Sequence, residues 1–397
     1  MSNNQNMLVS SKYLLLMLAV AMSNFMGFGS YLLLAIGLLF LLFHYDSAKV
    51  SASVLPLLLF SCIYFLFTLY YQGLLGAAQI FVCPLLWIVG YNLPEAKRFY
   101  TIFAVIAVMA VGMCFHGLAN YVYNIVQGVS MFSATKVDVW TGEGAAATGQ
   151  AAHFTMFLGC LFWLVIVQKR KWIRVTSIGV FLCALLYAIQ LGSRSFIVLC
   201  LLTAFTGIGV YIMRKGKSKQ KIRLLLALCF LVAIIAVVYI TDMWGLRTYI
   251  EGGYMVRRAA KGQSLGKIFT DTRITLKIEY FKRLFVYPWG GGKVSSEIVG
   301  SYEYTGGYAH DLWLDMFDEA GILALVALVI YTIASIYRIV AVRNDSRVLP
   351  DEKIALVCYA ITVFAQFCVE PIWQGSPMLF LSFVLIDGMM AKYKMHA

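Results

Sequence analysis

The feature that most restricts this chain is a succession of apolar runs, each close to the length of a membrane-spanning helix. A helix needs about 20 mostly apolar residues to cross the hydrocarbon core of a bilayer. Suitable runs lie near 13–28, 30–44, 52–71, 73–92, 99–127, 151–168, 175–191, 195–213, 224–241, 320–341, 354–371 and 376–391. Because 61% of the 397 residues are hydrophobic and 13% are charged, too few polar side chains remain to cover a water-soluble fold. The sequence therefore predicts an all-α, polytopic membrane protein with about twelve spans. It excludes a soluble enzyme, a disordered chain and a nucleic-acid-binding domain.

The positions of the basic residues predict the orientation of these spans. Clusters of lysine and arginine follow every second run from the sixth onward, at 169–174, 214–223, 337–347 and 391–394. Such clusters favour the cytoplasmic side, so both termini are expected in the cytoplasm. The first run is expected to be a retained span. On this scheme 1–242 holds the first nine helices, 243–319 is a large extracytoplasmic loop, and 320–397 holds the last three helices.

The large external loop is basic, although topology gives no reason for it. Residues 243–310 contain ten Lys or Arg and five Asp or Glu, a net charge of +5. One interpretation is a solvated surface beside lipid headgroups. The other is an anion site, because the forked guanidinium of arginine matches phosphate oxygens bidentately. Arg194, which stands in the short turn between the seventh and eighth runs, favours the anion site, with snorkelling to the interface as its alternative role.

The same loop ends with a residue suited to proton transfer. His310 opens the amphipathic segment HDLWLDMFDEAG, and an imidazole titrates near neutral pH. Asp311, Asp315 and Asp318 share another face of this segment. Acidic residues in the first turns of a helix stabilise its dipole, and this role is favoured over catalysis for most of the four acids Asp311, Asp315, Asp318 and Glu319.

Residues 271–292 are expected to form an amphipathic helix at the membrane interface, followed by a glycine turn. The positions that suggest this helix by their spacing are Ile274, Lys277, Ile278, Phe281 and Leu284. The three glycines at 290–292 either let backbone amides approach an anion or form an ordinary turn, and the pattern leaves both open.

The sequence indicates neither a metal site nor another cofactor. The cysteines lie in apolar runs without zinc-ligand spacing, and the external segments lack a carboxylate cluster with the spacing of metal ligands. His116 and His153 lie inside apolar runs, where hydrogen bonds between helices are the expected role.

Three motifs, in this order along the chain, resemble the superfamily of bacterial O-antigen polymerases and O-antigen ligases. Arg194 lies in a GSR turn, and Arg273 heads the amphipathic segment before a P-x-G-x-G sequence. The third motif, H-N-x-x-L-x(6)-G, is fitted by His310, Asp311, Leu314 and Gly321. It departs at one position, where aspartate replaces the usual asparagine. The resemblance covers roughly residues 140–390, whereas the N-terminal helices share only their general hydropathy.

The resemblance implies a glycosyltransferase of GT-C-type architecture in the bacterial inner membrane. Such an enzyme transfers a glycan from undecaprenyl pyrophosphate on the periplasmic side, without a metal and with inversion at the anomeric carbon. The implied partners are the lipid-linked donor and acceptor, membrane lipids and a chain-length regulator, and no nucleic acid. Arg194 and Arg273 are expected to bind the pyrophosphate. His310 is expected to act as the base or to hydrogen-bond the phosphate or acceptor. The further candidates for substrate binding are Asp311, Tyr308, Arg283 and Glu370.

Two alternatives accompany the polymerase. A ligase would transfer the finished glycan to lipid A-core, but the C-terminal EPIWQGSPMLFLSFVLIDG is more similar to polymerases. A transporter of lipid-linked glycans is less favoured, because the two halves of the chain show no repeat and the charges concentrate in loops. Glu370, within this C-terminal segment, is interpreted first as a solvated helix end and second as a carboxylate that positions the acceptor.

Overall fold

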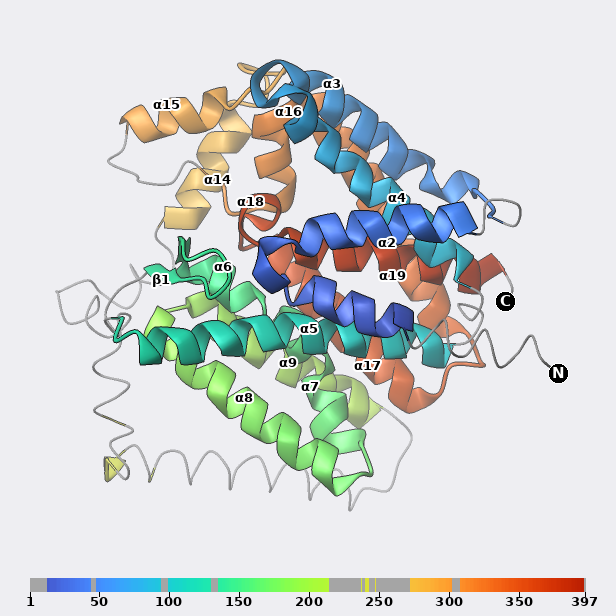
Figure 1. Ribbon diagram of the computed structural model, residues 1–397, viewed down its shortest axis with the longest axis vertical. Helices are drawn as coiled ribbons and strands as arrows, with labels where there is room; N and C mark the ends of the chain where they lie inside the picture. Colours follow the sequence, from blue (N-terminus) through green and yellow to red (C-terminus); the bar gives the residue numbers. More distant parts are fainter. Residues whose placement is uncertain are drawn as a thin grey trace.

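The structure, a computed structural model, describes residues 13–43, 48–93, 99–129, 135–213, 237, 240–242, 247, 272–301 and 308–395. Up to residue 150 its elements are a helix at Tyr13–Met22, η1 (Phe25–Gly27), α2 (Gly29–Phe43), η2 (Ala52–Val54), α3 (Leu55–Ala78), η3 (Gln79–Phe81), α4 (Val82–Asn92), α5 (Phe99–Val126), β1 (Thr135–Val137) and β2 (Gly144–Ala146). Then follow α6 (Ala147–Ala152), α7 (Thr155–Phe162), η4 (Trp163–Val167), α8 (Lys171–Leu191), α9 (Arg194–Met213), α14 (Thr272–Lys282), α15 (Lys293–Ser301), α16 (Leu312–Asn344), α17 (Pro350–Phe367), α18 (Ile372–Gly375) and α19 (Pro377–Met395). The two strands pair antiparallel, with Lys136 opposite Ala145. The described chain is thus a helical bundle with one small hairpin (Figure 1).

Six helices in the described part are long and apolar enough to cross a membrane. They are Ala52–Asn92, Phe99–Val126, Gly149–Val167, Lys171–Leu191, Ser195–Ile212 and Leu312–Asn344. Every predicted run lies on a helix except 224–241, most of which falls outside the described residues. The predicted helical fold with membrane-length helices is confirmed, while twelve spans and the GT-C architecture stay predictions.

Two of the long helices are interrupted at a glycine with a positive φ. Gly73 (φ 72°) lies inside Ala52–Asn92, which covers both the third and the fourth predicted run. Gly321 (φ 82°) separates the first turns of α16, residues 312–320, from the rest of that helix. Side chains other than hydrogen are strained in this region of backbone conformation, so both breaks depend on glycine.

The last helix is the centre of the bundle. Every residue of α19 from Met378 to Ala391 is buried, and α19 packs against α4, α5 and α16. Glycines allow the closest of these contacts, because a Cβ at Gly90 would lie 2.1 Å from the carbonyl oxygen of Leu385 and one at Gly388 equally close to that of Trp87. Small residues permit the same close approach between helices in membranes generally.

A buried ion pair joins this central helix to its neighbours. Arg338 of α16 donates from Nε to Asp387 Oδ1 at 2.8 Å and from a terminal nitrogen to Oδ2 at 2.6 Å. Trp87 Nε1 of α4 donates to the same carboxylate at 2.9 Å. The side chains of Arg338 and Asp387 are 7% and 1% exposed. The expectation that charges concentrate in loops is therefore wrong at this pair, because a complementary partner makes burial of each charge tolerable.

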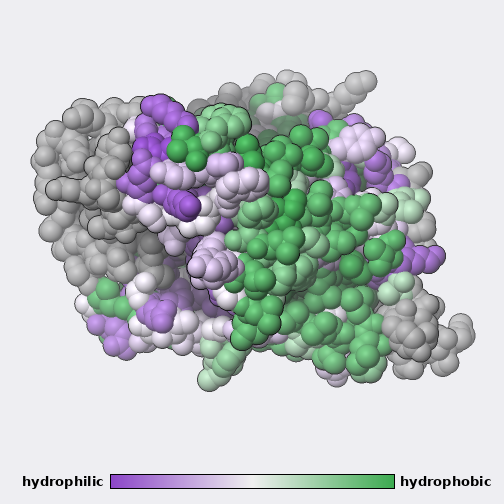
Figure 2. Space-filling view, turned by 90° about the horizontal axis from the view of Figure 1, so that it is seen from above, coloured by the Kyte–Doolittle hydropathy of each residue, from purple (hydrophilic) through white to green (hydrophobic). Residues whose placement is uncertain are grey.

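The two ends of the bundle differ in character. Arg347 lies over the ring of Tyr393 at 4.9 Å and Lys394 over that of Tyr337 at 3.9 Å, so the predicted basic clusters at 337–347 and 391–394 meet at one end. At the other end lie α14, α15, α18 and the hairpin, towards the left of Figure 1. Figure 2 shows a broad apolar area between hydrophilic groups, the surface pattern of a protein surrounded by lipid. The membrane side that each end faces stays a prediction, and the cluster at 214–223 lies outside the described residues.

Candidate functional site

His310 lies in the loop that leads into α16, and one buried carboxylate fixes its backbone. Its φ of 56° is left-handed, which a residue other than glycine keeps only where its surroundings impose it. Asp315, 3% exposed, accepts hydrogen bonds from the amides of the residues on either side, Ala309 at 2.7 Å and Asp311 at 3.2 Å. Asp311 also caps α16 by accepting from two amides of the first turn, the helix-start role expected of these acids. The start of α16 therefore holds His310 in one conformation.

Glu370 is the carboxylate that faces His310. It is 1% exposed, so its interpretation as a solvated helix end is wrong. Its Oε1 accepts a hydrogen bond from Ser195 Oγ at 2.7 Å, and its Oε2 lies 3.9 Å from His310 Nδ1. The His310 side chain is 24% exposed, so the ring connects a buried carboxylate with the surface. A carboxylate beside one ring nitrogen orients the imidazole and stabilises its protonated form, while the other nitrogen remains for a substrate.

Arg194 lies next to this pair along the chain. It is the first residue of α9, directly before the Ser195 whose hydroxyl binds Glu370. The side chains of Arg194 and Arg273 lie outside the part that the structure describes, so their contacts with a pyrophosphate stay predictions. The backbone of Arg194 nevertheless lies directly beside Ser195, the residue whose hydroxyl donates a hydrogen bond to Glu370.

The helix that carries Arg273 is tied to the loop of His310. Arg273 is the second residue of α14. One turn later Lys277 Nζ pairs with Asp311 Oδ2 at 3.1 Å and also donates to the carbonyl of Cys368, just beyond α17. Three segments, α14, the end of α17 and the start of α16, therefore meet around His310.

Tyr308 and Arg283, two weaker candidates, have different surroundings. Tyr308 is 42% exposed and precedes His310 by two residues, so its ring is accessible beside the site. Arg283 instead joins α14 to α15, because its guanidinium binds Glu279 and also donates from Nε to Glu297 at 3.2 Å. The same guanidinium holds the pKa of Glu297 below its usual value. The described contacts of Arg283 are those of a clamp between two helices.

The glycine turn serves α16 rather than an anion. The amides of Gly291 and Gly292 donate to carbonyl oxygens of α16, at 3.0 and 2.8 Å, and that of Gly290 bonds within the turn. A Cβ at Gly321 would lie 2.4 Å from the carbonyl oxygen of Pro288. Of the two open interpretations, the ordinary turn fits, and the P-x-G-x-G segment packs directly on the glycine of the histidine motif.

The amphipathic helix is confirmed, but α14 has apolar residues on two sides. Its inner side buries Leu276, Tyr280 and, one turn on, Leu284, which pack with residues of α15 and α16. Of the apolar residues used to predict it, Ile274, Ile278 and Phe281 are 56%, 49% and 66% exposed, whereas Leu284 lies on the inner side. A helix with one apolar side on the protein and another left outside suits the boundary between protein and lipid.

Glu319 forms a polar junction that the sequence did not indicate. Its carboxylate accepts hydrogen bonds from the Tyr64 hydroxyl of α3 and from the Gln374 amide of α18. Its backbone carbonyl accepts from the Tyr71 hydroxyl at 2.6 Å. The sequence around Glu319 does not identify these partners, because Tyr64 lies 255 residues upstream and Gln374 lies 55 residues downstream.

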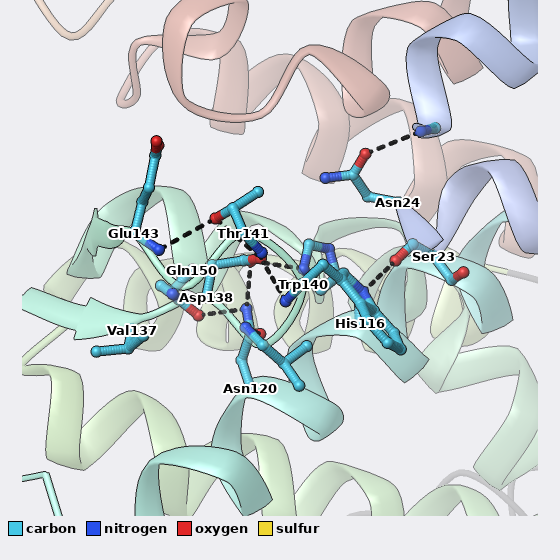
Figure 3. Close-up of polar contacts among 12 residues, drawn as sticks. Ser23, Asn24, His116, Asn120, Val137, Asp138, Trp140, Thr141, Glu143 and Gln150 are labelled. Atoms are coloured by element: carbon cyan, nitrogen blue, oxygen red, sulfur yellow. Dashed lines mark hydrogen bonds and ion pairs between the residues drawn. The ribbon is translucent and has the colours of Figure 1, made fainter. Parts of the chain in front are cut away.

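A second buried network fastens the hairpin to α5 (Figure 3). Asp138 Oδ2 lies 2.7 Å from His116 Nε2 and accepts from Asn120 Nδ2 at 3.1 Å. The amides of Trp140 and Thr141 donate to Oδ1 at 3.0 and 3.1 Å. Burial raises the pKa of Asp138, but the bonds from His116 and the two amides outweigh it and hold the pKa well below its usual range. The carboxylate is thus a fully ligated anchor.

Further amides extend this network along α5. Asn120 Nδ2 also donates to Gln150 Oε1 at 2.8 Å, which accepts from the Tyr187 hydroxyl at 2.9 Å. Asn124 binds both backbone groups of Val137 in β1, at 2.7 and 2.9 Å. His116, expected to bond between helices, instead bonds the hairpin. The available signal was the recurrence of polar residues every four positions at the end of an apolar helix.

No group of three or more His, Cys, Asp or Glu in the described residues is arranged to hold a metal ion, and the cysteines among them are free thiols. Comparison with models of known protein families finds no match, and comparison with curated proteins finds none either. The site is therefore interpreted from its own geometry.

Proposed function

We propose that this protein is a glycosyltransferase that uses a glycan linked to undecaprenyl pyrophosphate, and that it acts as an O-antigen polymerase. The observation that carries the proposal is the meeting of His310, Glu370 and the start of α9, which come from three distant parts of the chain. These positions include the histidine and one arginine of the motifs that resemble the O-antigen polymerase and ligase superfamily.

The location of the site supports this proposal. Beyond the break at Gly321, α16 continues to Asn344, a length of about 35 Å that is enough to cross the hydrocarbon core of about 30 Å. His310 precedes its first turn, and the basic cluster at 337–347 lies at its opposite end. If the basic end is cytoplasmic, His310 faces the periplasm, where lipid-linked glycans are assembled.

The proposed reaction is a direct displacement at the anomeric carbon of the donor. A hydroxyl oxygen of the acceptor forms a bond to this carbon, and the bond from the carbon to the pyrophosphate oxygen breaks. The electron pair leaves with the undecaprenyl pyrophosphate, and the hydroxyl proton passes to His310. Glu370 stabilises the resulting imidazolium, since its Oε2 lies 3.9 Å from Nδ1. Attack opposite the leaving group inverts the configuration.

The charge that develops on the pyrophosphate needs fixed cationic partners. Arg194 and Arg273 have this role in the proposal, because two guanidiniums bind phosphate oxygens bidentately and need no metal. Arg194 begins the helix whose second residue binds Glu370. Arg273 belongs to the helix that Lys277 ties to Asp311. Both backbones thus belong to elements that meet around His310.

The decisive experiment uses the purified protein with lipid-linked repeat units in detergent or vesicles. We expect elongated glycan on the lipid carrier without added metal. We expect His310→Ala, Arg194→Ala and Arg273→Ala to abolish elongation at unchanged protein abundance, and Arg273→Lys to restore little of it. Near-normal elongation by any of the three alanine variants would remove that residue from the mechanism, and no product from the wild type would overturn the proposal.

A cell-based measurement separates the polymerase from its alternatives. Loss of a polymerase leaves single repeat units on lipid A-core, whereas loss of a ligase leaves none. A transporter would move intact lipid-linked glycan across vesicles without extending it. The buried charge pair of Arg338 and Asp387 is a feature that transporters share, but each charge here has its partner, and the transporter therefore stays an outcome of the test.

A further inference from the structure

We infer that Glu319 is a positioning residue that sets the geometry between His310 and Glu370. The inference rests on the proposed glycosyl transfer and adds to it a residue outside the motifs. Glu319 belongs to the first turns of α16, before the break at Gly321. It need not touch the substrate, because its two partners hold other parts of the site.

The first step is the attachment of α18. This short helix begins two residues after Glu370, so its position determines where that carboxylate lies. The Gln374 amide of α18 donates to Glu319, and the ring of Trp373 packs edge-on against Tyr64 at 6.3 Å. Tyr64 donates its hydroxyl to the same Glu319 carboxylate. Glu319 thus joins α18 to both α3 and α16.

The second step is the attachment of His310 to the same helical segment. Asp315 precedes Glu319 by four residues, about one turn of α-helix. It binds the amides that flank His310, at 2.7 and 3.2 Å. Asp315 therefore holds the histidine, and Glu319, one turn later, holds the helix that follows Glu370. The spacing of the two acids fixes the distance between the base and its carboxylate partner.

The first turns of α16 are themselves held by the turn at residues 288–292. Ile322 donates its amide to the carbonyl of Pro288 at 2.8 Å, and the amides of Gly291 and Gly292 bond the carbonyls of Glu319 and Asp318. These contacts pin the first turns of α16 at the break in the helix. Loss of the Glu319 side chain would then release α18 and leave the segment itself in place.

Exchanging the carboxylate at position 319 and the amide at position 374 tests whether Glu319 acts by positioning α18. In Glu319→Gln the amide of Gln374 can rotate and present its oxygen, so the bond survives and we expect kcat within about threefold of wild type. Glu319→Ala loses the bond, and we expect kcat to fall about ten- to a hundredfold with KM nearly unchanged. Gln374→Glu places two carboxylates together and should be as impaired as the alanine variant. The double variant Glu319→Gln/Gln374→Glu restores a carboxylate–amide bond and should recover most of the rate.

The matched control is Asp318→Asn. Asp318 is the neighbouring acid, but its carboxylate binds the amides of Val294 and Ser295 and holds α15 instead of α18. We expect its kcat to stay near that of wild type. A Glu319→Gln variant as inactive as Glu319→Ala would mean that the carboxylate itself acts on substrate, and would overturn the positioning role. So would a double variant no better than Gln374→Glu, or an active Glu319→Ala. A wild-type protein without elongation would instead reject the proposed function.

Discussion

Two buried carboxylates, Asp138 and Glu370, each face a histidine. The two pairs differ in distance and exposure, as expected if the first pair holds the fold and the second belongs to the proposed site. Asp138 Oδ2 lies 2.7 Å from His116 Nε2, and the imidazole is 2% exposed. Glu370 Oε2 lies 3.9 Å from His310 Nδ1, and that imidazole is 24% exposed. Asp138 also receives an asparagine amide and two backbone amides. The shorter pair, at His116, is sealed inside the protein and fixes a hairpin, whereas the longer pair, at His310, reaches the surface.

The backbone around each histidine shows the same contrast. His116 belongs to the regular helix α5, whereas His310 has a φ of 56° that Asp315 maintains. Strained backbone of this kind is concentrated at functional sites. The comparison therefore predicts that substitutions at His310 and Glu370 affect activity, and that substitutions around Asp138 affect stability.

The largest expected effect is on activity. His310→Asn and Glu370→Gln leave a neutral polar side chain at each position but remove the base and its carboxylate partner. We expect glycan elongation to fall about 10²- to 10⁴-fold for the histidine variant and less for the glutamine variant. The thermal unfolding midpoint of each purified variant should stay near that of wild type. Retained elongation in His310→Asn would show that the two carboxylate–histidine pairs do not differ as proposed.

The next effect concerns the turn that supports the site. Gly321→Ala adds a Cβ that would lie 2.4 Å from the carbonyl of Pro288, at a φ of 82°. Gly291→Ala has a similar φ of 79° but meets no atom within 4 Å. We expect the control to lose about 1–2 kcal/mol from its backbone conformation alone, and Gly321→Ala to lose clearly more. Denaturant or thermal unfolding measures both, and equal losses would mean that the packing of this turn on α16 contributes nothing.

The hairpin network gives a smaller effect, confined to stability. Asp138→Ala removes the acceptor of five hydrogen-bonding groups, and we expect a loss of about 3 kcal/mol in unfolding free energy. The rate per folded molecule should be little changed, because the groups that bind the Asp138 carboxylate belong to α5 and to the hairpin. A variant that is stable yet inactive would place Asp138 in the chemistry and remove the distinction between the two pairs.

The Asp138 carboxyl also makes the stability of the folded protein depend on pH, in a direction that its pKa determines. Because the folded pKa of Asp138 is depressed, its contribution to stability is complete above the unfolded pKa of about 3.9. The contribution is lost as the pH falls below that value through the folded pKa. The unfolding midpoint of wild type should therefore drop more steeply below about pH 4 than that of Asp138→Asn. Parallel profiles for the two proteins would contradict an ionised anchor.

The smallest effect distinguishes the two sides of α14. Ile278 is 49% exposed and Leu276 is 5% exposed. We expect Ile278→Ser to change the unfolding free energy by less than about 0.5 kcal/mol, and Leu276→Ser to lower it by about 2 kcal/mol. In vesicles, a polarity-sensitive dye on Phe281→Cys should report lipid, and the same dye on Lys282→Cys should report water. Matching signals at both positions would argue against an interfacial helix.

The sequence predicted the helices and part of the site for clear physical reasons. Apolar runs of fixed length determine spans, and the motif around His310 identified a histidine that indeed faces a carboxylate. The aspartate in place of the motif asparagine serves as a cap for α16 and a partner for Lys277. Local patterns of this kind need no knowledge of distant contacts.

The interactions that were missed all join distant parts of the chain. The position of Glu370 at a helix end next to proline predicts a solvated carboxylate. Its partner Ser195 lies 175 residues away, so the local sequence does not reveal it. By sequence Arg338 belongs to a basic cluster, whereas in the structure it pairs with Asp387 on another helix. The glycine triplet is compatible with two interpretations by sequence, and the bonds from the Gly291 and Gly292 amides to α16 favour the ordinary turn. Burial of a polar group depends on tertiary partners, which a local pattern does not reveal.

The bond between Arg338 and Asp387 also bears on how a long substrate must move. It joins α16 to α19, the helix with the most continuous burial, and through Trp87 to α4. The helix that begins beside His310 is thus bonded, near its far end, to a helix whose residues 378–391 are all buried. For the proposed polymerase, we expect a stationary reaction centre past which the polymer and its lipid carrier travel.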